Sequence, residues 1–86
     1  MPYDSKLSNT YMDELYDAIL LLENREECYR FFEDICTIKE LQSISQRLQV
    51  AKLLNDKNTY HEIEKITGAS TATISRVNRC IQYGAE

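Results

Sequence analysis

The segment from Thr59 to Ile81 constrains the fold most strongly, because it contains the start of one helix, a glycine turn and a second helix. Thr59 and Glu62 have the Thr-x-x-Glu spacing of a capping box, in which both side chains satisfy free backbone N–H groups at a helix start. Gly68 marks the end of this helix, since glycine adopts the left-handed backbone conformation without a steric penalty. We expect two helices joined by a tight turn at Gly68-Ala69-Ser70.

The second helix of this pair has one apolar face and one face of small, hydroxylated and basic residues. It starts at Ser70 or Thr71, and its apolar residues Ile74, Val77 and Ile81 lie three and four residues apart. Short side chains let a helix backbone approach DNA bases closely, and hydroxyl groups bond to base edges or phosphates. The expected outward face carries no carboxylate and consists of Ser70, Thr71, Thr73, Ser75, Arg76 and Arg79.

The spacing of the apolar residues and of Gly68 is compatible with two interpretations of this segment. One is a plain helical hairpin in a protein that never contacts nucleic acid. The other is a helix–turn–helix, whose second helix enters the DNA major groove. The short turn favours the second interpretation because it makes the helices cross steeply. We expect the inner contacts of that crossing to come from Ile63, Ala69, Ile74 and Val77.

Three more helices are predicted before this segment, so we expect one all-α, five-helix domain over residues 1–86. Each begins at a capping signal: Thr10 opens a helix to about Leu22, Asn24 opens one through Ile35, and the Thr37-x-x-Glu40 capping box opens a long one to about Leu54. The long helix has an apolar stripe formed by Leu41, Ile44, Leu48 and Ala51 and widened by Val50 and Leu54.

The first two helices are apolar on more sides than one small chain can bury. Tyr11, Leu15 and Ile19 form one stripe, and Phe31 and Phe32 contribute to another surface. A helix that is apolar on most sides must be covered on most sides, and the expected cover is a partner subunit in a twofold homodimer. An aromatic-rich monomeric core stays open as the alternative. We expect residues 1–56 to form the dimerisation helices and residues 57–86 to form the DNA-reading head.

The net charge of −4 is unevenly distributed along the chain. Residues 1–56 carry 6 basic and 11 acidic side chains, a balance of −5, whereas residues 57–86 carry 4 and 3, a balance of +1. The acidic charge therefore lies outside the expected reading head. Because so few cations are present, phosphate contacts contribute modestly, and we expect DNA binding to need the doubled contacts of a dimer.

Several other functions have no support in the composition. No apolar run approaches the ~18 residues of a membrane span and the N-terminus lacks a signal-sequence pattern, so we expect a cytoplasmic protein without membrane contact. The three cysteines form no C-x-x-C pair and His61 is the single histidine, which disfavours disulfides and a metal site. We expect no enzymatic activity, since the chain has no glycine-rich phosphate loop and no nucleophile placed beside a base.

The chain resembles the Trp repressor family, specifically a small Trp-repressor-related branch from Gram-positive bacteria. The resemblance runs from about Leu22 to Asn78 and is most specific at Gly68-Ala69-x-x-Ala72-Thr73-Ile74-Ser75-Arg76, which matches the family motif Gly-Ala-x-x-Ala-Thr-Ile-Ser/Thr-Arg. It implies an intertwined homodimer with two reading heads about one DNA turn apart on a palindromic operator. The chain stops at Glu86, before the final helix of Trp repressor, so we expect the dimer core to close differently.

The resemblance also implies which residues contact double-stranded DNA. Tyr60, His61 and Glu64 stand where Trp repressor has a glutamine, an arginine and a lysine that approach DNA, so we expect weaker phosphate contacts or a different operator. The implied DNA-binding residues are Tyr60 and His61 in the first reading helix and Ser70, Thr71, Ala72, Thr73 and Ser75 in the second, with Arg76 and Arg79 added from the basic face.

A ligand site is implied by two arginines, Arg47 and Arg76, which match the pair that sandwiches the indole ring in Trp repressor. Planar guanidinium groups stack on aromatic faces and bind carboxylates. Val77 replaces a glycine beside that ligand, and Arg79-Cys80 replaces the segment that supplies a serine, which disfavours tryptophan. Another small-molecule corepressor stays open, as does a site without ligand in which Arg47 pairs with a carboxylate and Arg76 holds a phosphate. We expect no required cofactor.

These patterns predict a sequence-specific DNA-binding transcription regulator, a repressor that binds a palindromic operator as a homodimer. The alternative is a protein-interaction module that retains the helix–turn–helix fold without specific DNA binding. The acidic total charge, with His61 and Glu64 in place of cations, is the feature that supports this alternative.

Overall fold

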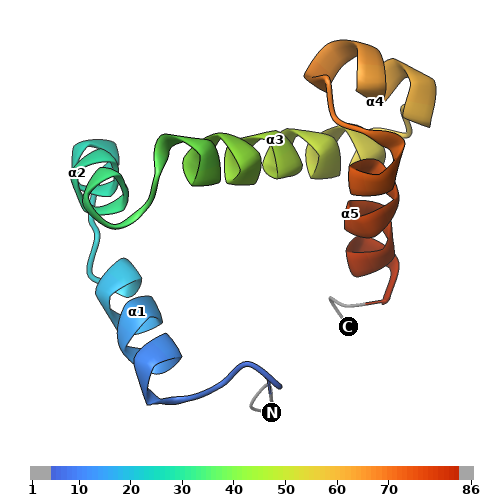
Figure 1. The fold of residues 1–86 in the computed structure, drawn as a ribbon. Coiled ribbons are helices and arrows are strands. Elements are labelled where there is room, and N and C mark those ends of the chain that lie inside the picture. Colours follow the sequence, from blue (N-terminus) through green and yellow to red (C-terminus); the bar gives the residue numbers. More distant parts are fainter. Residues whose placement is uncertain (1–4, 84–86) are drawn as a thin grey trace. The chain divides into compact units, whose positions relative to one another are not determined.

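The computed structural model describes residues 5–83, and within them the chain forms five helices and no strand (Figure 1). The predicted all-α class is confirmed. The expectation that the dimer core closes differently near Glu86 concerns residues outside the described range. The helices are α1 (Thr10–Leu20), α2 (Arg25–Ile35), α3 (Ile38–Asn55), α4 (Tyr60–Thr67) and α5 (Thr71–Tyr83).

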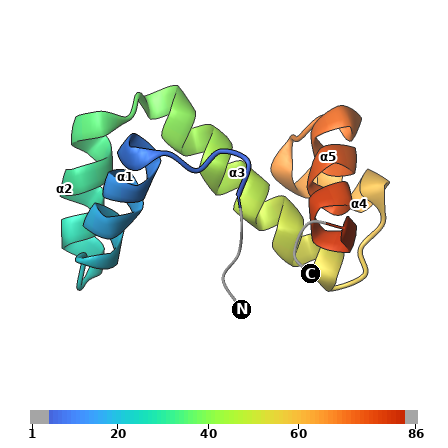
Figure 2. The same ribbon diagram turned by 90° about the horizontal axis from the view of Figure 1, so that it is seen from below.

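The chain divides into two compact units at the boundary between Cys36 and Thr37. The first contains α1 and α2, and the second contains α3, α4 and α5, with α4 and α5 both packed on α3 (Figure 2). α3 therefore belongs to the same compact unit as the helix–turn–helix. The functional division into a dimerisation part, 1–56, and a reading part, 57–86, stays a prediction.

The helix starts follow the capping signals of the sequence. In both predicted capping boxes the threonine Oγ1 accepts the backbone N–H three residues on, at 3.1 Å for Thr37 and 3.2 Å for Thr59. The glutamates Glu40 and Glu62 each accept the backbone N–H of their threonine at 2.7 Å. These reciprocal bonds satisfy N–H groups that a helix start otherwise leaves free, so each capping box defines where its helix begins.

The predicted ends of the first helix need a small correction. α1 is capped by Asn9, whose Oδ1 accepts the Met12 N–H at 2.9 Å, so the cap lies one residue before the predicted Thr10. The helix ends at Leu20 instead of Leu22, because the N–H groups of Leu21 and Leu22 bond to carbonyls three residues back. This tighter pattern is typical of a last helical turn.

A small core in the second unit holds α3, α4 and α5 together. Val50, Ile63 and Ile74 are fully buried, and Ala69 is 4% exposed. Val77 is partly buried against them, together with Leu53, Leu54 and Tyr60. The predicted inner contacts of the helix crossing, Ile63, Ala69, Ile74 and Val77, are therefore confirmed.

The apolar surface predicted for α3 is only partly covered within its own unit. Ile44 and Leu48 are 56% and 59% exposed, and the face of α3 that is buried centres on Val50. The reason is that α4 and α5 cover the face of Val50, Leu53 and Leu54, whereas the stripe through Ile44 and Leu48 lies on a different side of the helix. α3 thus has two apolar faces: α4 and α5 cover the face of Val50, and the face of Ile44 and Leu48 stays exposed within this unit.

The turn between α4 and α5 depends on a left-handed glycine. Gly68 has φ 75° and ψ 4°, and its N–H donates to the Glu64 carbonyl oxygen at 2.9 Å. Beside it, the Thr67 hydroxyl donates to the Ile63 carbonyl at 2.8 Å and accepts the Ala69 N–H at 3.1 Å. These bonds satisfy the end of α4 and direct Ala69 into the core, so the chain can enter α5 within three residues.

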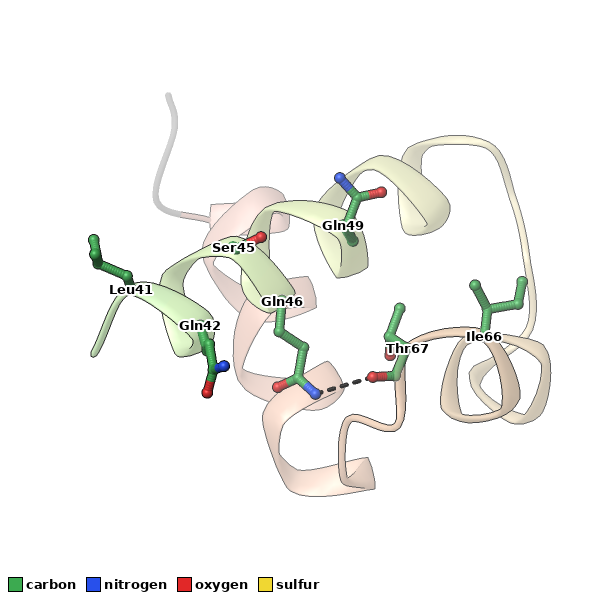
Figure 3. Close-up of a pocket in the computed structure, with 7 residues that line it drawn as sticks. All are labelled: Leu41, Gln42, Ser45, Gln46, Gln49, Ile66 and Thr67. Carbon is green, nitrogen blue, oxygen red and sulfur yellow. Dashed lines mark hydrogen bonds between the residues drawn. The ribbon is translucent and has the colours of Figure 1, made fainter. Parts of the chain in front are cut away.

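Gln46 joins the start of this turn to α3. Its Nε2 donates to the Thr67 carbonyl oxygen at 3.1 Å, which satisfies an acceptor at the end of α4 (Figure 3). The bond lies in a groove of about 580 Å³ between α3 and α4, which the exposed side chain of Ile66 also lines. The groove is lined by Leu41, Gln42, Ser45, Gln46, Gln49, Ile66 and Thr67.

Replacement of Gly68 by alanine is expected to lower the free energy of unfolding by about 1–2 kcal/mol through backbone strain alone. A Cβ added at Gly68 meets no atom within 4 Å, so steric crowding contributes nothing. Gly68→Asn should cost less, since asparagine tolerates the left-handed region better. Urea denaturation of both variants measures this, and an equal loss of several kcal/mol in both would contradict the backbone explanation.

Candidate nucleic-acid interface

Several of the residues that the sequence predicted for DNA contact are exposed at the start of α5 and on its outward side. Ile74 is buried against α3 and α4, so the other side of the helix faces outward. Thr73 and Ser75 are half-buried near the edges of this face. The exposed members are Ser70, Thr71, Ala72, Arg76 and Arg79.

Ser70 caps the N-terminus of α5. Its Oγ accepts the backbone N–H of Thr73 at 3.1 Å, and its carbonyl oxygen accepts the N–H of Ile74 at 3.0 Å. The Ser70 hydroxyl also donates to Oγ1 of Thr73 at 3.1 Å. Because the hydroxyl is engaged in both directions, the role that the structure gives Ser70 is to start the helix.

Thr71, the first residue of α5, is bonded to a carboxylate. Its Oγ1 hydroxyl donates to Oε2 of Glu64, a half-buried residue of α4. Sequence reasoning had noted Glu64 only as an acidic residue in place of a cation. The contact itself carries no local sequence signal, since the two residues are seven positions apart and meet only because the turn folds α5 back against α4.

The two residues predicted at the start of α4 are placed differently. His61 is exposed, whereas Tyr60 is half-buried and packs against the core. The Tyr60 hydroxyl accepts a hydrogen bond from Nδ2 of Asn78 on α5 at 3.2 Å. Tyr60 thus joins α4 to α5, and of the two residues only His61 is exposed.

The structure brings the two predicted ligand-binding arginines together. Arg47 from α3 and Arg76 from α5 line a cavity of about 150 Å³, together with Ala72 and Thr73. The ion pair found among residues 5–83 joins Arg30 to Glu26 at 2.7 Å, so neither Arg47 nor Arg76 has a carboxylate partner within that range. The cavity therefore has two cationic groups and a hydroxyl, which is a set of donors suited to an anion.

The described part of the chain offers no sign of other site chemistry. Residues 5–83 contain no cluster of three His, Cys, Asp or Glu side chains that could hold a metal ion. None of their helices is both long enough and apolar enough to cross a membrane. The three cysteines are free, with Cys28 and Cys36 half-buried and Cys80 exposed.

Two short helices, α4 and α5, joined by a three-residue turn and both packed on α3, form a helix–turn–helix domain. The chain belongs to the Trp repressor family, since the family model for Trp repressor protein matches residues 10–86. The resemblance inferred from residues 22–78 is therefore confirmed and extends over α1. The family is named for a repressor, which is a regulator of transcription.

Relatives from Gram-positive bacteria match most of the chain. The uncharacterized protein YerC of Bacillus subtilis is 61% identical over 79 residues, which cover 92% of this chain and 76% of that protein. A crystal structure of a candidate Trp repressor from Staphylococcus aureus has a TM-score of 0.86 at 63% identity and covers 91% of this chain and 78% of that one. These similarities confirm the five-helix, Trp-repressor-like fold.

A second crystal structure leads to the same conclusion. The TrpR-like protein from Eubacterium eligens has a TM-score of 0.87 at 54% identity, with coverage of 91% of this chain and 80% of that one. At such levels of identity, the fold and the placement of the helix–turn–helix within it are shared.

Proposed function

We propose that this chain is a cytoplasmic, sequence-specific DNA-binding transcription regulator that acts as a homodimer on a palindromic operator. The observation that carries the proposal is the exposed surface of α5 in a member of the Trp repressor family: Ser70 and Thr71 are exposed at its start, and Ala72, Arg76 and Arg79 are exposed on the side opposite the buried Ile74. We assign the protein to repression, because occupancy of an operator excludes other proteins without any further contact surface.

The roles of the individual residues follow from their positions. The exposed guanidinium groups of Arg76 and Arg79 suit phosphate contacts, which set affinity without reading sequence. The short side chains of Thr71, Ala72 and Thr73 occupy the first turn of α5, the part of a recognition helix that reaches base edges. His61 and Ser75 extend the contact on either side. In this account Ser70 and Tyr60 act by positioning α5 through the bonds described above.

Homodimerisation is supported by the apolar surface that the chain leaves uncovered. α1 and α2 contain no buried residue, and in the second unit Ile38, Ile44 and Leu48 of α3 are more than half exposed. A large exposed apolar surface is rare on a monomer and marks an interaction site. A second copy would cover it and would also double the phosphate contacts, which are few in each reading head.

A small-molecule ligand is proposed for the cavity between Arg47 and Arg76. Its volume of about 150 Å³ is below the ~300–1,000 Å³ of pockets for drug-sized ligands, which favours a compact anion over tryptophan. Because Thr73 and Arg76 belong both to this cavity and to the DNA-contacting face, a bound ligand would alter DNA binding directly. No cofactor is needed for the proposed function.

The second candidate function is a protein-interaction module that retains the fold without specific DNA binding. The observation that favours it is the carboxylate of Glu64 on α4, which lies against Thr71 at the start of α5, since a negative charge there opposes DNA phosphates. The two functions differ in the expected effect of substitutions on α5. Only a DNA reader should lose its activity when Thr73 or Arg76 is changed.

Affinity selection of sheared genomic DNA by the purified protein, in roughly 100 mM salt where bulk binding is weak, should enrich a palindrome with half-sites about 10 base pairs apart. Arg76→Ala should weaken binding to all duplexes and reduce the salt dependence by about two phosphate contacts per dimer. Thr73→Ala should relax the preference at one position in each half-site. Arg30→Ala is the matched control, because that arginine is already paired with Glu26.

Two outcomes would contradict the DNA-reading proposal. One is the absence of an enriched motif, both alone and after addition of tryptophan or cell extract. The other is an enriched motif that Thr73→Ala and Arg76→Ala leave unchanged in sequence and in affinity. Enrichment that requires extract would support control by a ligand other than tryptophan.

Introduction of a charge at Leu48 is expected to dissociate the dimer. Leu48 is 59% exposed on the uncovered face of α3, and Leu48→Glu would place a carboxylate in the proposed apolar interface. Sedimentation equilibrium should give twice the chain mass of 10.1 kDa for the wild type and the chain mass itself for Leu48→Glu. Gln49→Glu adds the same charge at the next residue and should stay dimeric. A dimeric Leu48→Glu variant would overturn the assignment of this face.

A further inference from the structure

We propose that Glu64 is a specificity-determining residue of the DNA interface, which makes Thr71 a pure hydrogen-bond acceptor toward the bases. The base that Thr71 reads would then be adenine or cytosine on the contacted strand, the two bases that present an exocyclic amino group in the major groove. The inference rests on the proposed function, since it requires the start of α5 to lie in the major groove.

The direction of the hydrogen bond between Thr71 and Glu64 follows from their chemistry. An ionised carboxylate has acceptor sites only, so the proton between Oγ1 of Thr71 and Oε2 of Glu64 must come from the threonine. A threonine hydroxyl has one proton and two lone pairs. With its proton held by Glu64, Thr71 can accept a hydrogen bond from a DNA base but cannot donate one.

The pair is placed where a base contact is made. Thr71 is the first residue of α5 and is exposed, and residues at the N-terminus of a recognition helix are those that reach base edges. Glu64 is half-buried behind it on α4, so the carboxylate orients the hydroxyl from the protein side. Lone pairs left on the Glu64 carboxylate can accept from the amino group of cytosine, which is a usual partner of acidic residues in DNA recognition.

The charge of Glu64 excludes other partners. A DNA phosphate has acceptor oxygens and a negative charge, so it can neither donate to Thr71 nor approach the carboxylate without repulsion. Thymine O4 and guanine O6 and N7 are also acceptors, and an acceptor-only Thr71 would be left unpaired against them. An unpaired polar group at a desolvated interface is costly, which makes this position discriminating.

Thr73, two residues further along α5, differs from Thr71 in that its hydroxyl can donate a hydrogen bond to DNA. Its Oγ1 accepts the proton of the Ser70 hydroxyl, so its own proton stays available to donate. The start of α5 would therefore present an acceptor at Thr71 and a donor at Thr73. This pattern is set by two protein residues, Glu64 and Ser70, whose own side chains are engaged in orienting the hydroxyls.

The test is a parallel selection from a pool of random duplexes with the wild type and four variants. Thr71→Val removes the hydroxyl at nearly constant volume, whereas Thr71→Ser keeps it. Glu64→Gln removes the charge and can itself donate, which releases the fixed direction of the bond. Asp56→Asn, at the C-cap of α3, removes the same charge where residues 5–83 show no hydrogen bond to the side chain. Circular dichroism and the denaturation midpoint check that each variant is folded.

The wild type and Thr71→Ser should enrich adenine or cytosine at one position of each half-site, by about tenfold over thymine and guanine. Thr71→Val should lose this preference at that position alone. Glu64→Gln should reduce the preference to about threefold or less and raise the affinity for every duplex several-fold, since a negative charge next to a DNA-contacting residue is removed. Asp56→Asn should leave the motif unchanged.

Two results would overturn the inference and leave the proposed function intact. One is a motif that Thr71→Val and Glu64→Gln leave unaltered at every position. The other is a position sensitive to Thr71→Val at which the wild type prefers guanine or thymine on the contacted strand. If the wild type enriches no motif, the proposed function fails and this inference fails with it.

Discussion

The structure depends on the packing of a very small core, in which Ile63 of α4 and Ile74 of α5 meet Val50 of α3 around the short side chain of Ala69. Each of the three large side chains contributes about 1.5–3 kcal/mol by burial. Leu53, Leu54 and Val77 pack around this core and Gln46 bonds to the end of α4, so the packing on α3 sets the angle at which α5 leaves the turn. The orientation of the outward face is thus a direct consequence of which residues are buried.

The turn and the core act together on the site. The left-handed Gly68 and the doubly bonded Thr67 hydroxyl bring the start of α5 back against α4, where Thr71 reaches Glu64. The same packing places Arg76 beside Arg47 of α3. Side chains that are already held in one orientation, as Thr71 is by Glu64, lose less conformational freedom when they bind DNA. A short helix with few charges can therefore still distinguish between DNA sequences. The modest charge of the reading head then favours specificity over affinity.

The sequence was sufficient for those features that depend on local chemistry. Thr59, Glu62 and Gly68 define the limits of α4 through bonds within a few residues, and the spacing of Ile63, Ala69 and Ile74 defines the crossing. The periodicity of α3 showed a wide apolar surface that includes both Leu48 and Val50. It could not tell that the same unit buries Val50 and leaves Leu48 exposed, because this depends on where α4 and α5 pack. The bond between Thr71 and Glu64 was also beyond reach, since it depends on the angle between two helices.

The central claim, that the first turns of α5 read DNA, is tested most directly by an NMR titration of the ¹⁵N-labelled protein with its enriched duplex. The account predicts that the largest amide shifts fall in residues 70–76 and at His61, with smaller changes in α1 and α2. Shifts confined to α1 and α2, with residues 70–76 unmoved at saturating duplex, would contradict it.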